Sequence, residues 1–233
     1  METPGKPLAS GREADVFDIG DGWVLRRYRE HEGAEIEAAT IEHVRRHGFP
    51  APKVREAHGR DIVMERIDGA SMLDALIRRP WTFRHHARLL ADLHVRLHAI
   101  APPAGLPTPL GEGQAILHMD LHPANVLLSP RGPVVIDWAA ACRGMPEADV
   151  AQAWIIMATS VIPAPGWRRS VGASFRDAFV REFLRPFDRT AIRRIIPAVA
   201  ARRLRDPHVL DEERPNVERL VRRETGTATF RVR

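Results

Sequence analysis

A short polar loop carries a carboxylate and an amide side chain at close spacing. The loop spans residues 118–125 (HMDLHPAN), and apolar residues flank it on both sides. Asp120 and Asn125 lie on this loop, and Asp137 ends the next apolar run, PVVID. Carboxylate and amide oxygens suit Mg²⁺, which keeps several waters and shares phosphate oxygens. These residue types predict a phosphoryl-transfer site, in which Asn125 and Asp137 hold the metal and Asp120 accepts the proton of a hydroxyl group.

A β-hairpin is the element that must bring these groups together. The runs NVLL and PVVI indicate two strands with a turn at residues 129–132, Ser-Pro-Arg-Gly. A hairpin that begins at Asn125 returns its far end beside that residue, so the Asn125 amide oxygen and the Asp137 carboxylate can converge. The competing interpretation is a chance arrangement, in which Asp120 caps a turn and Asp137 ends an ordinary strand.

These two segments resemble the core of a known family. The loop HMDLHPAN and the strand VVIDW (134–138) resemble the catalytic core of the protein-kinase-like superfamily, most closely its aminoglycoside phosphotransferase/choline kinase branch. The resemblance implies an α+β, two-lobed protein-kinase-like fold with a small antiparallel-sheet N-lobe and a larger helical C-lobe. Residues 1–67 would form the N-lobe, a nucleotide-binding sheet plus one helix, and residues 68–233 the C-lobe with the catalytic loop and the metal strand.

The resemblance also implies a reaction and its cofactors. ATP and Mg²⁺ are the expected cofactors of an ATP-dependent phosphotransferase, a kinase that moves the γ-phosphoryl group to a hydroxyl of a small molecule. No activation loop ending in Ala-Pro-Glu follows Asp137, which argues against a protein substrate. The main alternative is a catalytically degenerate protein that binds nucleotide without turnover, because arginine replaces the usual lysine on the phosphate-binding strand and the phosphate-covering loop has a single glycine.

The remaining sequence supplies the elements that such a fold needs. Strand-like runs surround turns at residues 20–22 and 58–60, and a hinge is expected near residues 65–69. Helical patterns dominate after Gly69. The predicted helices cover residues 34–47, 71–78, 82–100 and most of 149–224, with interruptions near 163–166 and 206–207.

The strand WVLRRY carries the expected phosphate-binding cation. Kinases hold the α- and β-phosphates with a strand lysine that a helix glutamate orients. Alternate residues of a strand share a face, so Val24 would cover adenine while Arg26 reaches phosphate. Arg27 takes this role if the register differs by one residue. Arginine makes the contact planar and forked rather than a point charge.

Glu37 is the expected helix glutamate. Residues 37, 41 and 44 share one stripe of the predicted helix, so Glu37 points the same way as Ile41 and Val44, toward the sheet. The competing interpretation is an ordinary surface carboxylate. The other cofactor-binding candidates lie in the phosphate-covering turn ASGREADV and in the hinge IVMERIDG. They are Ser10 and Gly11, with Arg12 as a further candidate, and Met64, Glu65 and Ile67.

The histidines are predicted to be mainly structural. His94 and His98 are one helical turn apart, but no third ligand for zinc follows from the pattern. By the same family resemblance, His98 would brace the catalytic loop and Asp149 would anchor it from a helix. His118 is interpreted as a brace, whereas the pattern leaves open whether His122 contacts substrate.

Composition excludes several classes of protein. No run approaches the roughly 18 consecutive apolar residues of a membrane span, and the first residues lack the apolar core of a signal peptide. A lone Cys142 fits a reducing compartment, so a cytoplasmic location is expected. The pattern does not determine an oligomeric state.

Charge is distributed unevenly along the chain. Residues 151–233 contain 17 Arg and 9 Asp or Glu, out of a net charge of +5 for the whole chain. Because these arginines mix with acids, a solvated helix face is favoured over a nucleic-acid surface. This balance also disfavours a polycationic substrate, so we expect a neutral or anionic hydroxylated metabolite rather than an aminoglycoside.

Overall fold

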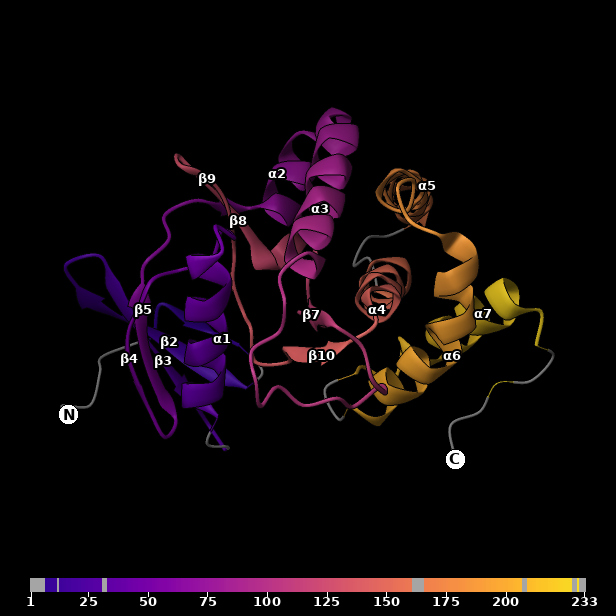
Figure 1. Cartoon of the computed structure of the whole chain (residues 1–233). Helices are drawn as coiled ribbons and strands as arrows, with labels where there is room; N and C mark the ends of the chain where they lie inside the picture. Colours follow the sequence, from indigo (N-terminus) through magenta and orange to yellow (C-terminus); the bar gives the residue numbers. More distant parts are fainter. Residues whose placement is uncertain are drawn as a thin grey trace.

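The computed structural model describes residues 7–11, 13–30, 33–160, 166–206, 209–227 and 230, with residues 166–171 described by their backbone. Arg12, one of the predicted phosphate-loop residues, lies outside these ranges. Figure 1 shows an N-terminal sheet with one helix on one side of the molecule and a group of helices on the other. This is the predicted α+β architecture.

The N-terminal sheet has five antiparallel strands in the order β1-β2-β3-β5-β4. Their bounds are β1 (Ala9–Ser10), β2 (Ala14–Gly20), β3 (Trp23–Tyr28), β4 (Val54–His58) and β5 (Asp61–Glu65). The predicted turns at residues 20–22 and 58–60 are both present, and they connect neighbouring strands of this sheet. The register pairs Val24 with Met64 and Arg26 with Ile62 across β3 and β5.

Helix α1 (Ala34–Arg46) packs against β4 and β5 of this sheet. Its buried residues recur at the three- and four-residue spacing of one helix face, which is why it lies flat on the sheet. They are Ala34, Glu37, Ala38, Thr40, Ile41 and Val44. A carboxylate in this stripe needs partners, because burying an unpaired charge is costly.

The region around loop 118–125 contains two small sheets. One has the order β6-β8-β9, from β6 (Ala70–Ser71), β8 (Val126–Ser129) and β9 (Gly132–Val135). The β8–β9 hairpin pairs Val126 with Val135 and turns at the predicted residues 129–132. The other sheet pairs β7 (Ala115–Leu117) with β10 (Cys142–Gly144). The sequence pattern did not predict β6 or β10, because strands of two or three residues are too short to show a period.

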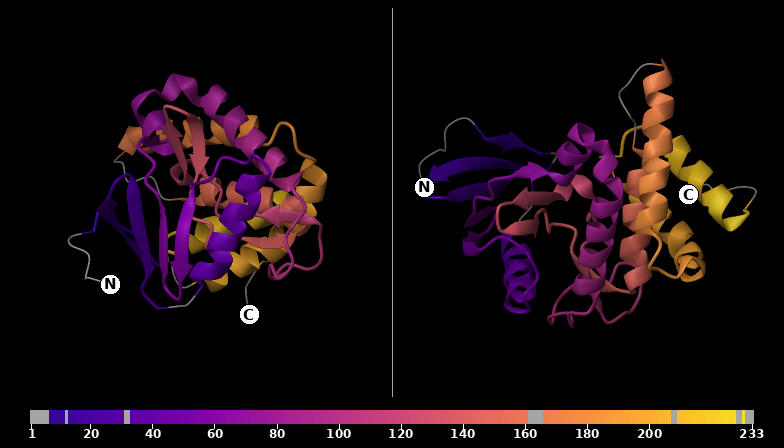
Figure 2. Two further views of the ribbon diagram at one scale, coloured as in Figure 1. Left: turned by 60° about the vertical axis from the view of Figure 1, so that its left-hand side comes forward. Right: turned by 90° about the horizontal axis from the view of Figure 1, so that it is seen from above.

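Helices form the rest of the molecule. In the right-hand view of Figure 2, the N-terminal sheet and the last helices lie at opposite ends of the molecule. The elements are α2 (Met72–Arg78), the 3₁₀ helix η1 (Pro80–Thr82), α3 (Phe83–His98), the 3₁₀ helix η2 (Pro123–Asn125), α4 (Pro146–Thr159), α5 (Gly166–Phe183), α6 (Arg189–Arg205) and α7 (Arg214–Thr225). Helix α4 begins before the predicted residue 149, since Pro146 suits the first turn of a helix.

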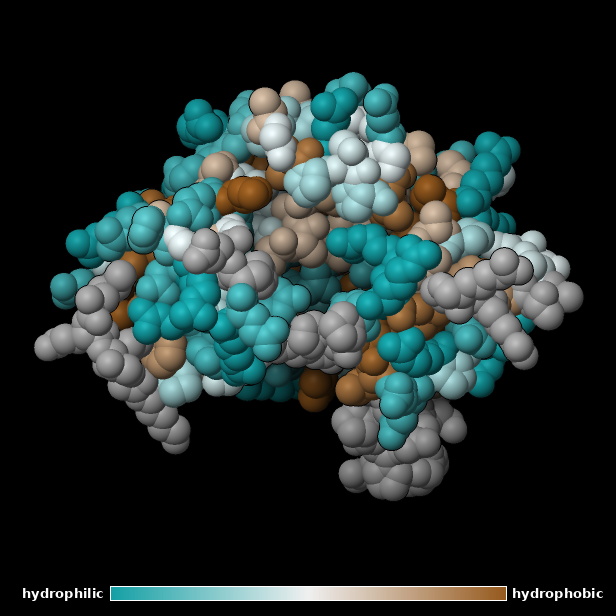
Figure 3. Space-filling view, turned by 90° about the horizontal axis from the view of Figure 1, so that it is seen from below, coloured by the Kyte–Doolittle hydropathy of each residue, from teal (hydrophilic) through white to brown (hydrophobic). Residues whose placement is uncertain are grey.

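Helix α4 is the centre of the helical part. It packs against α3, α5, α6 and α7, and nearly all of its side chains are buried. By contrast, hydrophilic side chains cover much of the face seen from below, with hydrophobic groups between them (Figure 3). Within the described ranges, we find no helix that combines the length and the apolar character needed to cross a membrane.

Candidate active site

Asp149 of helix α4 hydrogen-bonds to the backbone of loop 118–125. The Asp149 carboxylate accepts hydrogen bonds from the backbone N–H of His118 (3.1 Å) and of Met119 (2.6 Å). Its Oδ2 atom also lies 3.0 Å from His98 Nε2. Met119 has a φ of 62°, a conformation that non-glycine residues seldom adopt, so these bonds hold the loop in an unfavourable shape. Burial alone would raise the pKa of Asp149, but the His98 hydrogen bond and the nearby histidines hold it well below its usual range.

His118 connects the loop to the strand that ends at Asp137. Its Nδ1 atom accepts from the backbone N–H of Asp120 (3.2 Å), and its Nε2 atom donates to the Ile136 carbonyl (3.2 Å). The centre of the ring lies 4.6 Å from that of the Trp138 ring, and the two ring planes are tilted by 55°. Burial lowers the pKa of His118, which favours the neutral ring that can make both bonds. The geometry fits a brace rather than a base.

Asp120 lies beside two nitrogen donors. The Asn125 Nδ2 atom donates to the Asp120 carbonyl (2.9 Å) and to its carboxylate Oδ2 (2.8 Å). His122 Nε2 lies 3.5 Å from Oδ1, while His122 Nδ1 accepts from the Ala124 N–H. Burial alone would raise the pKa of Asp120, but the hydrogen bond and charge of His122, with help from His118 and Asn125, hold it below its ordinary value. Asp120 is therefore ionised at neutral pH and can accept a proton.

The β8–β9 hairpin brings Asn125 next to the strand end that carries Asp137. The Ile136 N–H donates to the Asn125 carbonyl (3.0 Å), one step beyond the Val126–Val135 pair. Because Asp120 occupies the Asn125 amide nitrogen, the amide oxygen is the atom left for a metal. The Asp137 side chain is 40% exposed, and its backbone has a φ of 66°.

This donor set fits Mg²⁺ but not a metal held by protein alone. Within the described residues, no three His, Cys, Asp or Glu side chains gather to bind a metal ion. One carboxylate and one amide oxygen instead suit an ion that completes its shell with waters and substrate phosphates, as Mg²⁺ does.

Arg26 contacts the proposed metal carboxylate. Its Nη2 atom donates to Asp137 Oδ1 at 2.6 Å, and its Nη1 atom lies 3.7 Å from Glu37 Oε1. Burial alone would lower the pKa of Arg26, but the charges of Glu37 and Asp137 raise it. The sequence pattern placed Arg26 near Glu37 but did not indicate the contact with Asp137.

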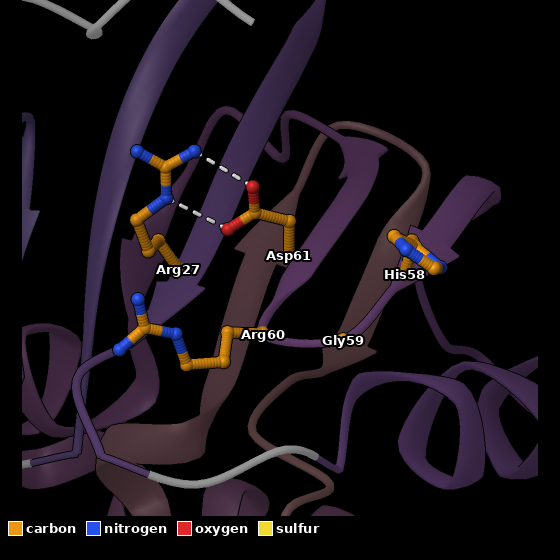
Figure 4. A pocket seen from close by; sticks show the side chains of 5 residues that line it. All are labelled: Arg27, His58, Gly59, Arg60 and Asp61. Carbon is orange, nitrogen blue, oxygen red and sulfur yellow. Dashed lines mark hydrogen bonds and ion pairs between the residues drawn. The ribbon is translucent and has the colours of Figure 1, made fainter.

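Arg27 belongs to a different site. It makes two hydrogen bonds of 2.7 Å to Asp61, and both residues line a pocket with residues 58–60 at the β4–β5 turn (Figure 4). No hydrogen bond or ion pair joins Arg27 to the catalytic loop in the part of the chain that the structure describes. The alternation along β3 therefore separates the two arginines, and only Arg26 faces Asp137.

Glu37 joins helix α1 to both β3 and the segment after Asp137. It is 3% exposed, and its Oε1 atom accepts from the backbone N–H of Trp138 at 3.0 Å. Its Oε2 atom accepts from the Tyr28 hydroxyl. Burial raises the pKa of Glu37, and Arg26 and the Tyr28 hydroxyl oppose that effect. The pattern did not single out Tyr28, although it follows Arg26 at the two-residue spacing of one strand face.

The other nucleotide candidates lie along the sheet. Val24 and Met64 are buried cross-strand partners, at 8% and 9% exposure. The Glu65 N–H donates to the Lys53 carbonyl (2.8 Å). In this geometry the Glu65 N–H is therefore not available to adenine, whereas its carbonyl is. Ile67 follows the strand and is half-buried.

The turn after β1 is tight and exposed. The Gly11 N–H donates to the Ala14 carbonyl (2.9 Å), and a Cβ at Gly11 would lie 3.2 Å from that oxygen. Among the described residues, neither Ser10 nor Gly11 makes a hydrogen bond or ion pair with Arg26 or Asp137.

Comparison with known proteins identifies the family. The family model "Phosphotransferase enzyme family" matches residues 4–114 and 103–195, well over half of the chain. The chain belongs to the phosphotransferase enzyme family. The predicted resemblance to aminoglycoside phosphotransferases and choline kinase-like proteins is thereby confirmed, together with the predicted fold class.

Several solved structures share the fold of this chain. The aminoglycoside phosphotransferase APH(4)-Ia, in a ternary complex with AMP-PNP and hygromycin B, has a TM-score of 0.68 at 16% identity and covers 96% of this chain and 94% of its own. The amicoumacin kinase hAmiN, in complex with AMP-PNP, Ca²⁺ and Ami, has a TM-score of 0.56 at 12% identity, over 97% and 89% of the two chains. A choline/ethanolamine kinase family protein from Mesorhizobium loti gives 0.55 at 15% identity, over 98% and 90%. At these identities the likeness concerns the fold.

One curated relative is much longer than this chain. It is a probable bifunctional tRNA threonylcarbamoyladenosine biosynthesis protein of Methanoculleus marisnigri (strain ATCC 35101 / DSM 1498 / JR1), 30% identical over 147 residues. The match takes in 58% of this chain and 24% of that protein, so the chain spans about a quarter of the relative's length.

Proposed function

We propose that this phosphotransferase transfers the γ-phosphoryl group of ATP to a hydroxyl of a small molecule, with Asp120 as the base. The observation that carries the proposal is the orientation of Asn125. Its amide nitrogen donates to the Asp120 carboxylate, which leaves the amide oxygen for a metal on the same hairpin as Asp137. The same loop thus carries a proton acceptor, Asp120, and a metal-binding oxygen, that of Asn125.

Each residue then has a distinct role. Asn125 and Asp137 would hold Mg²⁺, which when bound supplies electrostatic neutralisation of the phosphate charge. Asp120, kept ionised by His122, orients the acceptor hydroxyl and takes its proton. Arg26 exchanges its bond to Asp137 for the nucleotide phosphates, while Glu37 holds its other end.

The nucleotide would lie where the two parts of the chain meet. We assign residues 1–67 to a sheet-containing lobe and residues 68–233 to a helical lobe. The pairing of β6 with β8 supports this boundary, because it fastens residues 70–71 to the hairpin of the catalytic loop. Val24 and Met64 would line the adenine side, with the carbonyl of Glu65 and the backbone of Ile67 at its edge and the turn at Ser10 and Gly11 over the phosphates.

The fold neighbours support nucleotide binding and a small acceptor. Their names specify AMP-PNP or ADP, and hygromycin B or amicoumacin. We extend the nucleotide and the general class of small hydroxylated compound to this chain. A cytoplasmic location, predicted from composition, accords with such a substrate.

The alternative is a nucleotide-binding protein without turnover. The ion pair between Arg26 and Asp137 favours this alternative. Arg26 occupies the carboxylate proposed to bind the metal, and Asp137 occupies the guanidinium proposed to bind the phosphates. Direct measurement separates the two proposals: the enzyme binds Mg·ATP and releases ADP with an acceptor or with water, whereas the degenerate protein only binds.

Asp120→Asn tests the proposed base. The amide keeps the shape but cannot accept a proton, so turnover should fall by about 10²–10⁴-fold, the usual contribution of a positioned base. Mg·ADP affinity should change little, because Asp120 holds neither phosphate nor metal. ADP release is measured during a screen of hydroxylated metabolites, and Mg·ADP binding by calorimetry.

Asp92→Asn is the matched control, since Asp92 is an exposed carboxylate on α3 that faces Arg96. It should behave like the wild type. A collapse of Mg·ADP affinity in Asp120→Asn would show that Asp120 is a nucleotide-binding or structural residue. Binding by the wild type without ADP release under any condition would favour the degenerate alternative.

A further inference from the structure

Three residues of β3 share the face that meets α1 and the catalytic hairpin. Val24, Arg26 and Tyr28 alternate along the strand, so their side chains point to the same side of the sheet. Tyr28 is the only tyrosine of the chain and is 1% exposed. The Arg26 guanidinium carbon lies 5.2 Å from the centre of the Tyr28 ring, within the range of a cation–π contact.

The Tyr28 hydroxyl begins a continuous path of polar contacts to Asp137. It donates to Glu37 Oε2, and Glu37 Oε1 accepts from the backbone N–H of Trp138. Trp138 directly follows Asp137, and it is the Asp137 backbone that lies in the left-handed region, with a φ of 66°. The Asp137 carboxylate binds Arg26, which returns to Glu37 and to the Tyr28 ring. The five residues form a closed ring of contacts.

A cavity next to this ring shows why the hydroxyl matters. Space of about 170 Å³ lies between α1 and residues 138–141. It is lined by Tyr28, Gly33, Ile36, Glu37, Thr40, Pro107, Trp138, Ala139 and Ala141. Glu37 borders this cavity, so protein atoms do not enclose its side chain on every side. Hydrogen bonds from Tyr28 and from the Trp138 N–H orient its carboxylate.

We infer that Tyr28 is a positioning residue for the nucleotide and metal site, because its hydroxyl holds Glu37 in the orientation that aligns Arg26 and the Asp137 backbone. The inference rests on the proposed function for the roles of Arg26 and Asp137. In this inference Tyr28 acts through Glu37 and not by contact with the substrate. Without its hydroxyl, one oxygen of a buried carboxylate would lose its donor, and the carboxylate would move to find another.

Tyr28→Phe removes the hydroxyl and keeps the ring. The variant should fold, and its affinity for Mg·ADP, measured by calorimetry, should fall by about tenfold, the scale of one hydrogen bond to a charged group. The KM for Mg·ATP should rise by a similar factor while kcat changes less, because the acceptor side at Asp120 is untouched. Thermal unfolding checks that the variant remains folded.

Thr40→Val is the matched control. Thr40 lines the same cavity and is equally buried, but its hydroxyl donates to the Ile36 carbonyl rather than to Glu37. Loss of this hydroxyl should leave Mg·ADP affinity within about twofold of the wild type, although it removes a comparable hydrogen bond. A shared loss in both variants would indicate a general packing effect and overturn the inference.

A double-mutant cycle separates positioning from independent effects. If Tyr28 acts only through Glu37, the variant Tyr28→Phe/Glu37→Gln should bind Mg·ADP no more weakly than Glu37→Gln alone. Additive losses would overturn the inference, and so would a Tyr28→Phe protein with wild-type affinity. These binding readouts do not depend on turnover. The proposed function can therefore fail, through absent ADP release, while the inference stands, and the inference can fail while Asp120→Asn still abolishes turnover.

Discussion

Asp120 and Asp137 both carry carboxylates, but the two side chains have different neighbours. Asp120 lies beside the Asn125 amide nitrogen and the His122 ring. Asp137 is bound by a full positive charge from Arg26. A proton acceptor must stay free to receive a hydroxyl, whereas a metal ligand can exchange one cation for another. The neighbours therefore agree with the proposed roles.

Asp137→Ala should largely abolish Mg²⁺-dependent nucleotide binding and turnover, because Asp137 carries the only full charge assigned to the metal. In the absence of Mg²⁺, ADP affinity should be kept or increased, since Arg26 loses its competing partner. Calorimetry with and without EDTA measures both quantities. Asp211→Ala, at an exposed carboxylate paired with Arg214, serves as the control. Unchanged Mg²⁺ dependence in Asp137→Ala would refute the metal assignment.

Arg26→Ala should weaken Mg·ADP binding much more than Arg27→Ala. Arg26 faces Asp137 and Glu37, whereas Arg27 is held on the other side of β3 by Asp61. Loss of Arg27 removes a partly exposed ion pair, which is worth about 0–1 kcal/mol of folding stability. Mg·ADP calorimetry on both variants ranks them. The reverse ranking would transfer the phosphate-binding role to Arg27.

At the scale of elements, helices α3 and α4 stabilise loop 118–125. Asp149 on α4 accepts from two loop N–H groups and lies beside His98 of α3. His94, one turn earlier on α3, is fully buried and packs against Phe183. Its Nδ1 atom lies 2.9 Å from the Leu90 carbonyl, and within the described residues its Nε2 atom has no partner.

This buried histidine predicts how stability depends on pH. Burial lowers the pKa of His94 from its ordinary 6.5 to about 4. In the unfolded chain the ring takes up a proton below about pH 6.5, whereas in the folded protein it does so only near pH 4. The buried neutral ring therefore costs no folding stability above about pH 6.5. Below that pH, the free energy of unfolding falls by about 1.4 kcal/mol per pH unit until the pH reaches about 4.

Urea unfolding at pH 7, 6 and 5 measures this slope. His94→Leu should unfold with a shallower pH dependence than the wild type, because it removes the titrating group. His85→Leu, on the exposed side of α3, should keep the wild-type slope. His118 is also buried with a lowered pKa, so part of the slope should survive in His94→Leu. Equal slopes in the wild type and His94→Leu would contradict the prediction.

At the scale of the whole molecule, the C-terminal helices use their acids to pair their arginines. Glu213 pairs with the buried Arg203, and Asp211 with Arg214. Glu224 contacts both Arg193 and Arg223. These three carboxylates pair with arginines of the same C-terminal region, which leaves fewer carboxylates there to bind a cationic ligand.

This charge distribution predicts that common aminoglycosides are poor substrates, although APH(4)-Ia shares the fold. A polycation needs clustered unpaired carboxylates, and even Asp177, a candidate for such a cluster, lies 3.7 Å from Arg176. Expression in a susceptible bacterium should therefore leave aminoglycoside tolerance nearly unchanged. A large rise in tolerance that disappears with Asp120→Asn would overturn the prediction and keep the kinase proposal.

The sequence by itself determined the features that depend on neighbouring residues. The hairpin between Asn125 and Asp137 follows from two apolar runs and a four-residue turn, and it turns at the predicted residues 129–132. The separation of Arg26 from Arg27 follows from strand alternation, and the burial of Glu37 from the helix stripe. The family motif added the α+β fold, because motif and fold occur together.

Only the tertiary structure decided which distant groups meet. Arg26 and Asp137 are 111 residues apart, and Glu37 and the Trp138 N–H are 101 apart. The short strand β10 and the link from Asp149 to the loop backbone were equally hidden. Local propensity carries no information about such contacts, since they form only when α1, β3 and the hairpin pack together. A buried carboxylate such as Glu37 announces that partners must exist, but packing alone selects Tyr28 and Trp138 as those partners.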